Sequence, residues 1–198
     1  NDTFNYGDWA GTWILQSFRP AMLGYDGVVR EWLNVDDLTL TTDGAMSHIA
    51  DSAFAGNAMN IVTPIYVKLV ESGTRQYAYF SPEKLDADYE CWSAKLSDGS
   101  YAPFFGLPLF EGSVGDGKLR SLATAALPTA MTTATTEIQY AAANGPNWYP
   151  TLWADEMLMH LLGVLVFGRL NSQIALGGTY QAGASALILN CGSMTGKG

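Results

Sequence analysis

The chain has 198 residues, the size of one large domain or two small ones, and its 15% charged and 48% hydrophobic residues exclude an intrinsically disordered chain. The formal net charge of −9 argues against a nucleic-acid partner and against an anionic membrane surface, because both attract basic proteins. The longest apolar run, residues 157–167, is far shorter than the ~20 residues of a membrane-spanning helix, so no membrane insertion is expected. The chain begins with Asn1 and shows no signal peptide, which we interpret as a processed or excised piece.

The first 60 residues are predicted to be irregular, with loops and short strands held by aromatic side chains rather than helices. Residues 60–71 alternate apolar and polar side chains and are rich in β-branched residues, so they predict a strand. Pro64 places that strand at a sheet edge or a bulge. After a turn at Ser72 and Gly73, residues 75–81 predict a second strand that completes a hairpin.

The second half of the chain predicts two helices among further short strands. Residues 101–112 are an apolar run broken by two prolines, and residues 114–118 are a turn. Residues 132–143 predict a helix that Thr133 or Thr135 caps and that Asn144 and Gly145 end. Residues 153–167 predict another helix with acids near its start, and residues 186–189 a short strand. The chain is therefore expected to be one α+β domain with two helices, short and mostly antiparallel strands, and long loops.

No residue pattern points to catalysis, a metal or a cofactor. Neither histidine lies in a zinc-ligand spacing, and His160 is interpreted as a core or helix-face residue. The acid pairs are explained by solvated loops and a helix N-terminus; they are Asp36 with Asp37, Asp86 with Asp88, and Asp155 with Glu156. For Cys91 and Cys191, buried free thiols are favoured over a disulfide. We therefore expect no enzyme, no metal and no cofactor.

Aromatic side chains are the feature best suited to recognition, because they offer rigid contact area on which sugars stack. Four candidates are singled out as binding residues: Trp148, Tyr149, Trp153 and Tyr101. A position in the core is the favoured alternative for Trp153 and an equal one for Trp148.

Two groups of polar residues have either a binding or a structural role. Asn171 and Gln173, with Ser172 between them, either contact a ligand or hydrogen-bond the backbone of their own loop, and the second interpretation is favoured. Arg120 and Ser121 are interpreted as an internal clamp, with an acid such as Glu111 as the partner of the arginine.

Five segments, taken in order, resemble a known family. They are residues 64–69, 110–112, 118–121, 132–145 and 170–177, and together they span most of residues 60–178. Their order and spacing are similar to the C-type-lectin-like domain found at the tips of bacteriophage tail fibres and in related phage and prophage structural proteins. The resemblance divides the single domain 1–198 into an aromatic-rich part, 1–60, and a lectin-like core, 61–198. In the family the chain continues into a Gly- and Trp-rich segment, so this core is expected to be incomplete at its C-terminus.

The resemblance implies a phage or prophage virion protein, in a tail fibre or surface appendage, that binds a bacterial surface receptor, either protein or glycan. It also implies other virion subunits as partners and a homo-oligomer, by analogy a trimer. One alternative is a purely architectural virion protein that makes only protein–protein contacts. Another is an enzyme on the same fold, either an oxidase like the formylglycine-generating enzymes, with two neighbouring reactive cysteines, or a glycan hydrolase with an acid pair.

Overall fold

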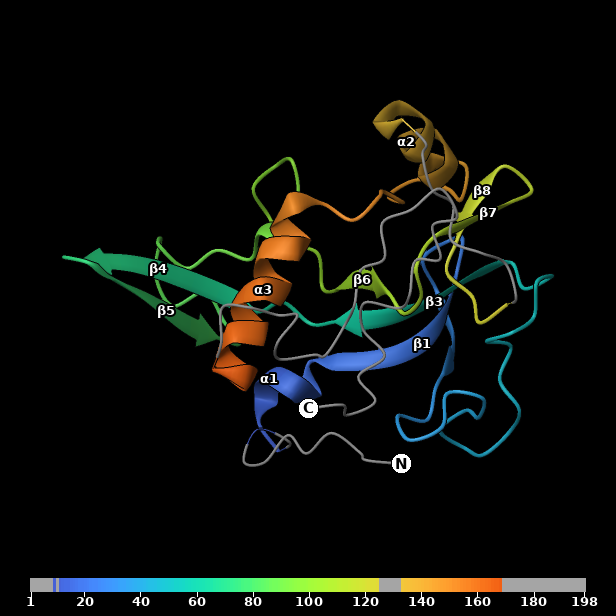
Figure 1. Cartoon of the computed structure of the whole chain (residues 1–198), viewed down its shortest axis with the longest axis horizontal. Helices are drawn as coiled ribbons and strands as arrows, with labels where there is room; N and C mark the ends of the chain where they lie inside the picture. Colours follow the sequence, from blue (N-terminus) through green and yellow to red (C-terminus); the bar gives the residue numbers. More distant parts are fainter. Residues whose placement is uncertain (1–8, 10, 125–132, 169–198) are drawn as a thin grey trace, which may run out of the picture.

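The computed structural model describes residues 9, 11–124 and 133–168, and it has the mixed helix and strand content of the α+β class, as predicted (Figure 1). The elements in chain order are α1 (Trp13–Gln16), β1 (Phe18–Gly24), β2 (Val29–Trp32), β3 (Gly56–Val62), β4 (Tyr66–Ser72), β5 (Arg75–Ser81), the 3-10 helix η2 (Trp92–Ala94), β6 (Phe105–Pro108), β7 (Ser113–Gly115), β8 (Lys118–Arg120), α2 (Ala134–Ala142) and α3 (Trp153–Phe167). The C-type-lectin-like assignment within this class stays a prediction.

The centre of the molecule is a four-stranded antiparallel sheet in the order β2-β1-β3-β6. Successive side chains of β1 point to opposite faces of the sheet, and each face packs in its own hydrophobic cluster. Met22 belongs to one cluster, and Ala21 and Leu23 belong to the other. The sheet is therefore covered on both faces. Residues 1–60 supply α1, β1, β2 and most of β3, so they are less irregular than predicted, and the prediction that they hold no helix is wrong. A boundary at residue 60 cuts through a strand.

The prediction of one strand over residues 60–71 is wrong. β3 ends at Val62 and β4 begins at Tyr66, with Pro64 between them, and the two strands belong to different sheets. Proline has no N–H to donate to a strand ladder, so it marks the point where the chain leaves the central sheet. The predicted hairpin is confirmed, because β4 and β5 pair in regular antiparallel register from the base to the turn after Ser72.

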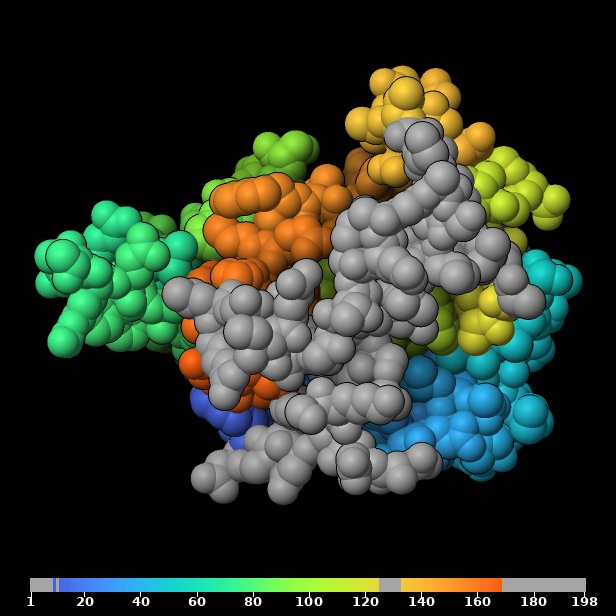
Figure 2. All heavy atoms as spheres, viewed as in Figure 1, coloured from blue at the N-terminus to red at the C-terminus, as the bar shows by residue number. Residues whose placement is uncertain are grey.

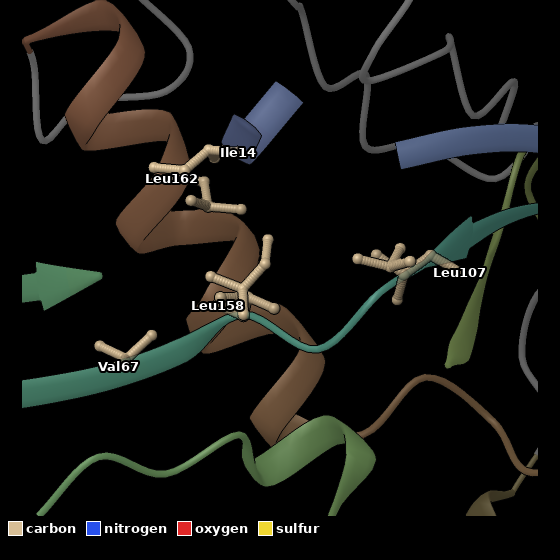
Figure 3. Packing of buried hydrophobic residues seen from close by; sticks show 7 residues of the cluster. Ile14, Val67, Leu107, Leu158 and Leu162 are labelled. Carbon is tan, nitrogen blue, oxygen red and sulfur yellow. The ribbon is translucent and has the colours of Figure 1, made fainter. Parts of the chain in front are cut away.

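Both predicted helices are present. Thr133 is the residue that caps α2, where its hydroxyl accepts a hydrogen bond from the N–H of Thr136 at 3.3 Å. α3 has the predicted bounds and ends at Gly168, whose φ of +63° is left-handed. Leu158 and Leu162 of α3 pack against Ile14 of α1 and Val67 of β4 (Figure 3). This cluster joins α3 to α1 and to the base of the hairpin.

A buried clamp at the end of β8 holds β3 and the loop before it. The Arg120 guanidinium donates to the carbonyl of Phe54 at 2.8 Å and, at longer range, to those of Ser52 and Gly56. The Ser121 hydroxyl donates to the β3 backbone at 2.9 Å. An internal clamp was predicted here, but the prediction of an acid such as Glu111 as the partner is wrong, because backbone carbonyls accept these bonds.

The hairpin β4–β5 extends from one end of the molecule along its longest axis (Figure 1). In the space-filling view the outer part of the hairpin stands clear of the other atoms (Figure 2). From Arg75 to Tyr79, every residue of β5 is exposed, and only Ser81 at the base of the strand is buried. The hairpin is thus an arm whose outer part contributes little to the core.

Candidate binding surface

The loop between α2 and α3 is attached to the rest of the molecule by Trp148. Its indole N–H donates to the carbonyl of Tyr25 at 2.9 Å, and its ring meets the Tyr25 ring edge to face with 6.4 Å between the centroids. Gly145 has a φ of +142°, and a Cβ there would lie 2.8 Å from the same carbonyl, so only glycine fits this close approach. Trp148, a predicted binding residue, therefore anchors the loop, and its hydrogen-bond donor is already used.

The chain between Trp148 and the first residue of α3 carries three exposed large side chains close together in the sequence. Tyr149 is 64% exposed, Trp153 is 76% exposed and Leu152 is about half exposed. We call Tyr149, Leu152 and Trp153 the aromatic patch. Patches of this kind on a soluble protein mark interaction sites more often than single exposed side chains do.

The favoured prediction, that Trp153 lies in the core, is wrong because its side chain is exposed. Helix geometry explains this exposure. α3 buries Leu158 and Leu162. At about 100° per residue, Trp153 lies about 140° around the helix axis from Leu158 and cannot share its face. The first residue of α3 therefore points away from the core that fixes the helix, which leaves its indole ring available to a ligand.

Acidic side chains border the aromatic patch. The carboxylate of Asp155 accepts a hydrogen bond from the N–H of Leu152 at 2.9 Å, which fixes the start of α3. Glu156, in the same first turn, is exposed. An aromatic surface beside a carboxylate offers stacking area and a hydrogen-bond acceptor. It suits a polyhydroxylated or basic ligand better than an anionic one.

Tyr101, another predicted binding residue, belongs to a separate polar cluster. Its hydroxyl donates to Glu90 at 2.6 Å and accepts from Lys84 at 2.8 Å, while its ring packs edge to face with Tyr66. Hydrogen bonds from Lys95, Tyr101 and Lys84 lower the pKa of Glu90 to about 2. The phenol of Tyr101 is thus occupied by neighbouring side chains, and this cluster was not foreseen from the sequence.

At least one acid of each pair has a structural partner in the described part of the chain. Asp86 and Asp88 both contact the Lys68 ammonium, at 3.0 and 2.8 Å. This ammonium is the main reason why the pKa of Asp86 is lowered. Asp37 accepts hydrogen bonds from Thr39 in its own loop. These contacts hold the carboxylates in place as hydrogen-bond acceptors.

The described residues hold no group of three His, Cys, Asp or Glu side chains that could bind a metal ion. His48 contacts Glu31 and stacks on Phe54, with 5.9 Å between the ring centroids, and His160 is exposed on α3. Cys91 is a buried free cysteine, as favoured, and burial raises the pKa of its thiol.

The remaining predicted site residues, Asn171 and Gln173, lie outside the described residues, as do Ser172 and Cys191. Leu152 was not predicted; its place between Tyr149 and Trp153 just before an apolar helix is the signal that could have found it.

Comparisons with family models, with curated proteins and with solved structures find no match to this chain. In the part of the chain that the structure describes, no helix is both long and apolar enough to cross a membrane.

Proposed function

We propose that this chain is a binding module of a bacteriophage or prophage virion, carried on a tail fibre or surface appendage, with a C-type-lectin-like fold. It contacts a bacterial surface receptor, protein or glycan, through a preformed surface and without covalent chemistry. Other virion subunits and further copies of the chain are its protein partners. The virion assignment rests on the resemblance of the sequence segments alone.

The aromatic patch is the observation that supports binding. Its residues are exposed, yet the chain on either side of them is fixed, by Trp148 bonded to Tyr25 before it and by the buried face of α3 after it. A rigid scaffold lowers the entropy that a binding surface loses when it meets its ligand. Tyrosine and tryptophan add large contact areas with few rotatable bonds.

Four of the five segments that carry the resemblance lie within or largely within the described residues, and residues 170–177 lie outside them. Residues 64–69 include the first part of β4, residues 110–112 precede β7, residues 118–121 include β8, and residues 132–145 include α2. Two of them, residues 118–121 and 132–145, contact each other where the loop that carries the patch begins, since Asn144 just after α2 donates to the carbonyl of Leu119 in β8 at 2.7 Å. This linkage supports treating these two segments and the patch as one unit.

The test measures binding of the labelled full chain to a panel of bacterial cell envelopes and immobilised glycans. Where the wild type binds, Trp153→Ala and Tyr149→Ala should each weaken binding at least ~10-fold, the size expected for a central aromatic contact. Leu85→Ala is the matched control, because Leu85 is also an exposed apolar residue but lies outside the patch. It should leave binding unchanged.

An architectural virion protein is the second candidate, and the same patch supports it if the patch contacts a neighbouring subunit and not a receptor. Exposed aromatic residues can instead be buried against a neighbouring subunit. Failure to bind any envelope or glycan, together with loss of assembly into particles in Trp153→Ala, would replace receptor binding by this function. Equal binding by the patch variants and the Leu85 control would remove the patch from receptor binding, and normal assembly of Trp153→Ala would remove it from the architectural role.

A further inference from the structure

The outer edge of β5 is an unpaired strand edge in the part of the chain that the structure describes. β5 pairs with β4 alone, and seven pairs in regular register join them. Gly73 has a φ of +61° and, with Thr74, forms a two-residue turn between the paired Ser72 and Arg75. Because hydrogen-bonded and non-bonded pairs alternate from such a turn, the N–H and C=O of Gln76, Ala78 and Phe80 face away from β4.

This edge carries few of the features that keep strand edges from pairing. Natural edges are protected by prolines, bulges or charged side chains. From Arg75 to Ser81 there is no proline and no register shift, and the only charge lies at Arg75 beside the turn. The exposed apolar side chains of the hairpin are Leu69, Tyr77 and Tyr79. A two-stranded hairpin with exposed aromatic residues is marginal by itself and gains stability from further strands.

The sequence of β5 is complementary to itself. If a second β5 pairs antiparallel with a two-fold axis at Ala78, the outward-facing groups of Ala78 meet their own copies. Tyr77 then lies opposite Tyr79 of the second copy, twice, and Gln76 lies opposite Phe80. Directly opposed aromatic residues stabilise such pairs, and this register brings no like charges together.

Charge also favours contact at the arm. The whole chain carries −9, so two copies repel over most of their surface. Residues 66–81 contain Lys68, Glu71 and Arg75 as their only charged residues. Since Lys68 is already held by two aspartates at the base, the outer half of the arm is left with one acid and one base. The arm is thus a part of the surface where a second copy meets little repulsion.

We propose that β5 is a self-association edge, and that two copies of the chain pair through it into a continuous antiparallel sheet β4-β5-β5-β4. The contact is two-fold, so it predicts a dimer in place of the trimer that the fibre-tip resemblance implies. It does not depend on what the chain binds, because the aromatic patch belongs to other elements. The joined sheet removes one unpaired edge from each copy and places the four tyrosines of the two strands side by side.

The experiment is sedimentation equilibrium of the full chain and of two double variants that test the register. Tyr77→Lys with Tyr79→Lys sets lysine opposite lysine in both equivalent pairs. Tyr77→Glu with Tyr79→Lys sets glutamate opposite lysine at the same positions, and both variants carry the same lysine opposite Lys68 of β4. Both variants remove the same two tyrosines, whose side chains are exposed, so circular dichroism should show the same fold in each.

We expect the wild type to be a dimer and the lysine–lysine variant to dissociate at least ~10-fold more readily than the lysine–glutamate variant. A wild type that is still monomeric at about 100 µM would have a dissociation constant too high for a specific dimer, and this result would overturn the proposal. So would a trimer, and so would two double variants with equal dissociation constants. The receptor-binding assay is run on the same variants. A lysine–lysine variant that is monomeric and still binds receptor would show that self-association and receptor binding are independent.

Discussion

Replacing Arg120 by alanine should lower the free energy of unfolding by about 3 kcal/mol. The buried guanidinium donates to the carbonyl of Phe54 at 2.8 Å and to those of Gly56 and Ser52 at 3.3 and 3.5 Å. A hydrogen bond from a charged donor contributes about 1.5–3 kcal/mol, and a buried carbonyl without a donor costs about 1–3 kcal/mol. Counting the short bond fully and the two long ones as weak gives this total. Against a typical stability of about 5–15 kcal/mol the loss is large.

Urea unfolding followed by tryptophan fluorescence measures the effect, with Arg30→Ala as the matched control. Arg30 lies 2.5 Å from Asp26, but both side chains are about half exposed. A surface ion pair of this kind contributes about 0.5 kcal/mol or less. The clamp is refuted as a source of stability if the two alanine variants lose equal amounts, or if Arg120→Ala loses less than about 1 kcal/mol.

Two further predictions concern Glu90 and Trp148. The pKa of Glu90 is lowered from 4.5 to about 2 in the folded chain, so its carboxylate stabilises the fold above pH 4.5 and this contribution is lost as pH falls towards 2. The melting temperature of Glu90→Gln should therefore lie below that of the wild type at neutral pH and meet it near pH 2; a gap that persists there would show another cause. Trp148→Phe keeps an aromatic ring but removes the donor to Tyr25, so urea unfolding should show a loss of about 1 kcal/mol. Binding should be unchanged, and a loss as large as that of Trp153→Ala would make Trp148 a contact residue.

Elements with strong local signals could be predicted from the sequence. α3 has acids in its first turn, an apolar body and Gly168 at its end, and its predicted bounds agree with the structure. The hairpin and the turn before Lys118 were also found, because glycine marks each turn. These features depend on neighbouring residues alone.

Elements that depend on distant contacts could not be predicted well. β1 is buried from Pro20 to Gly24, so it lacks the alternation that reveals a half-exposed strand. The alternation of residues 60–71 continues past Pro64, although the chain changes sheets there. A local pattern gives the direction of side chains along a strand but not which sheet the strand joins.

The candidate site shows the same division. Of the three aromatic residues chosen after Gly145, Tyr149 and Trp153 are exposed and Trp148 is bonded to Tyr25. Whether Trp153 is buried depends on the rotation of α3, which contacts with Ile14 and Val67 decide. The position of Trp148 depends on its hydrogen bond to Tyr25, 123 residues away in the sequence. The hydrogen bonds of Tyr101 to Glu90 and Lys84 were not predicted, because a local pattern does not show which side chains 11 and 17 residues away a tyrosine will meet.

The cluster that joins α1 to α3 has a consequence for how the protein is made. Ile14 and Leu162 are roughly 150 residues apart in the sequence, and contacts of such long range slow folding because a large loop must close first. During synthesis the N-terminal helix leaves the ribosome long before its partner exists. Until α3 emerges, the apolar side chains of the sheet near Val62 are not covered by this helix. The nascent chain is therefore most prone to aggregation just before its last described helix leaves the ribosome.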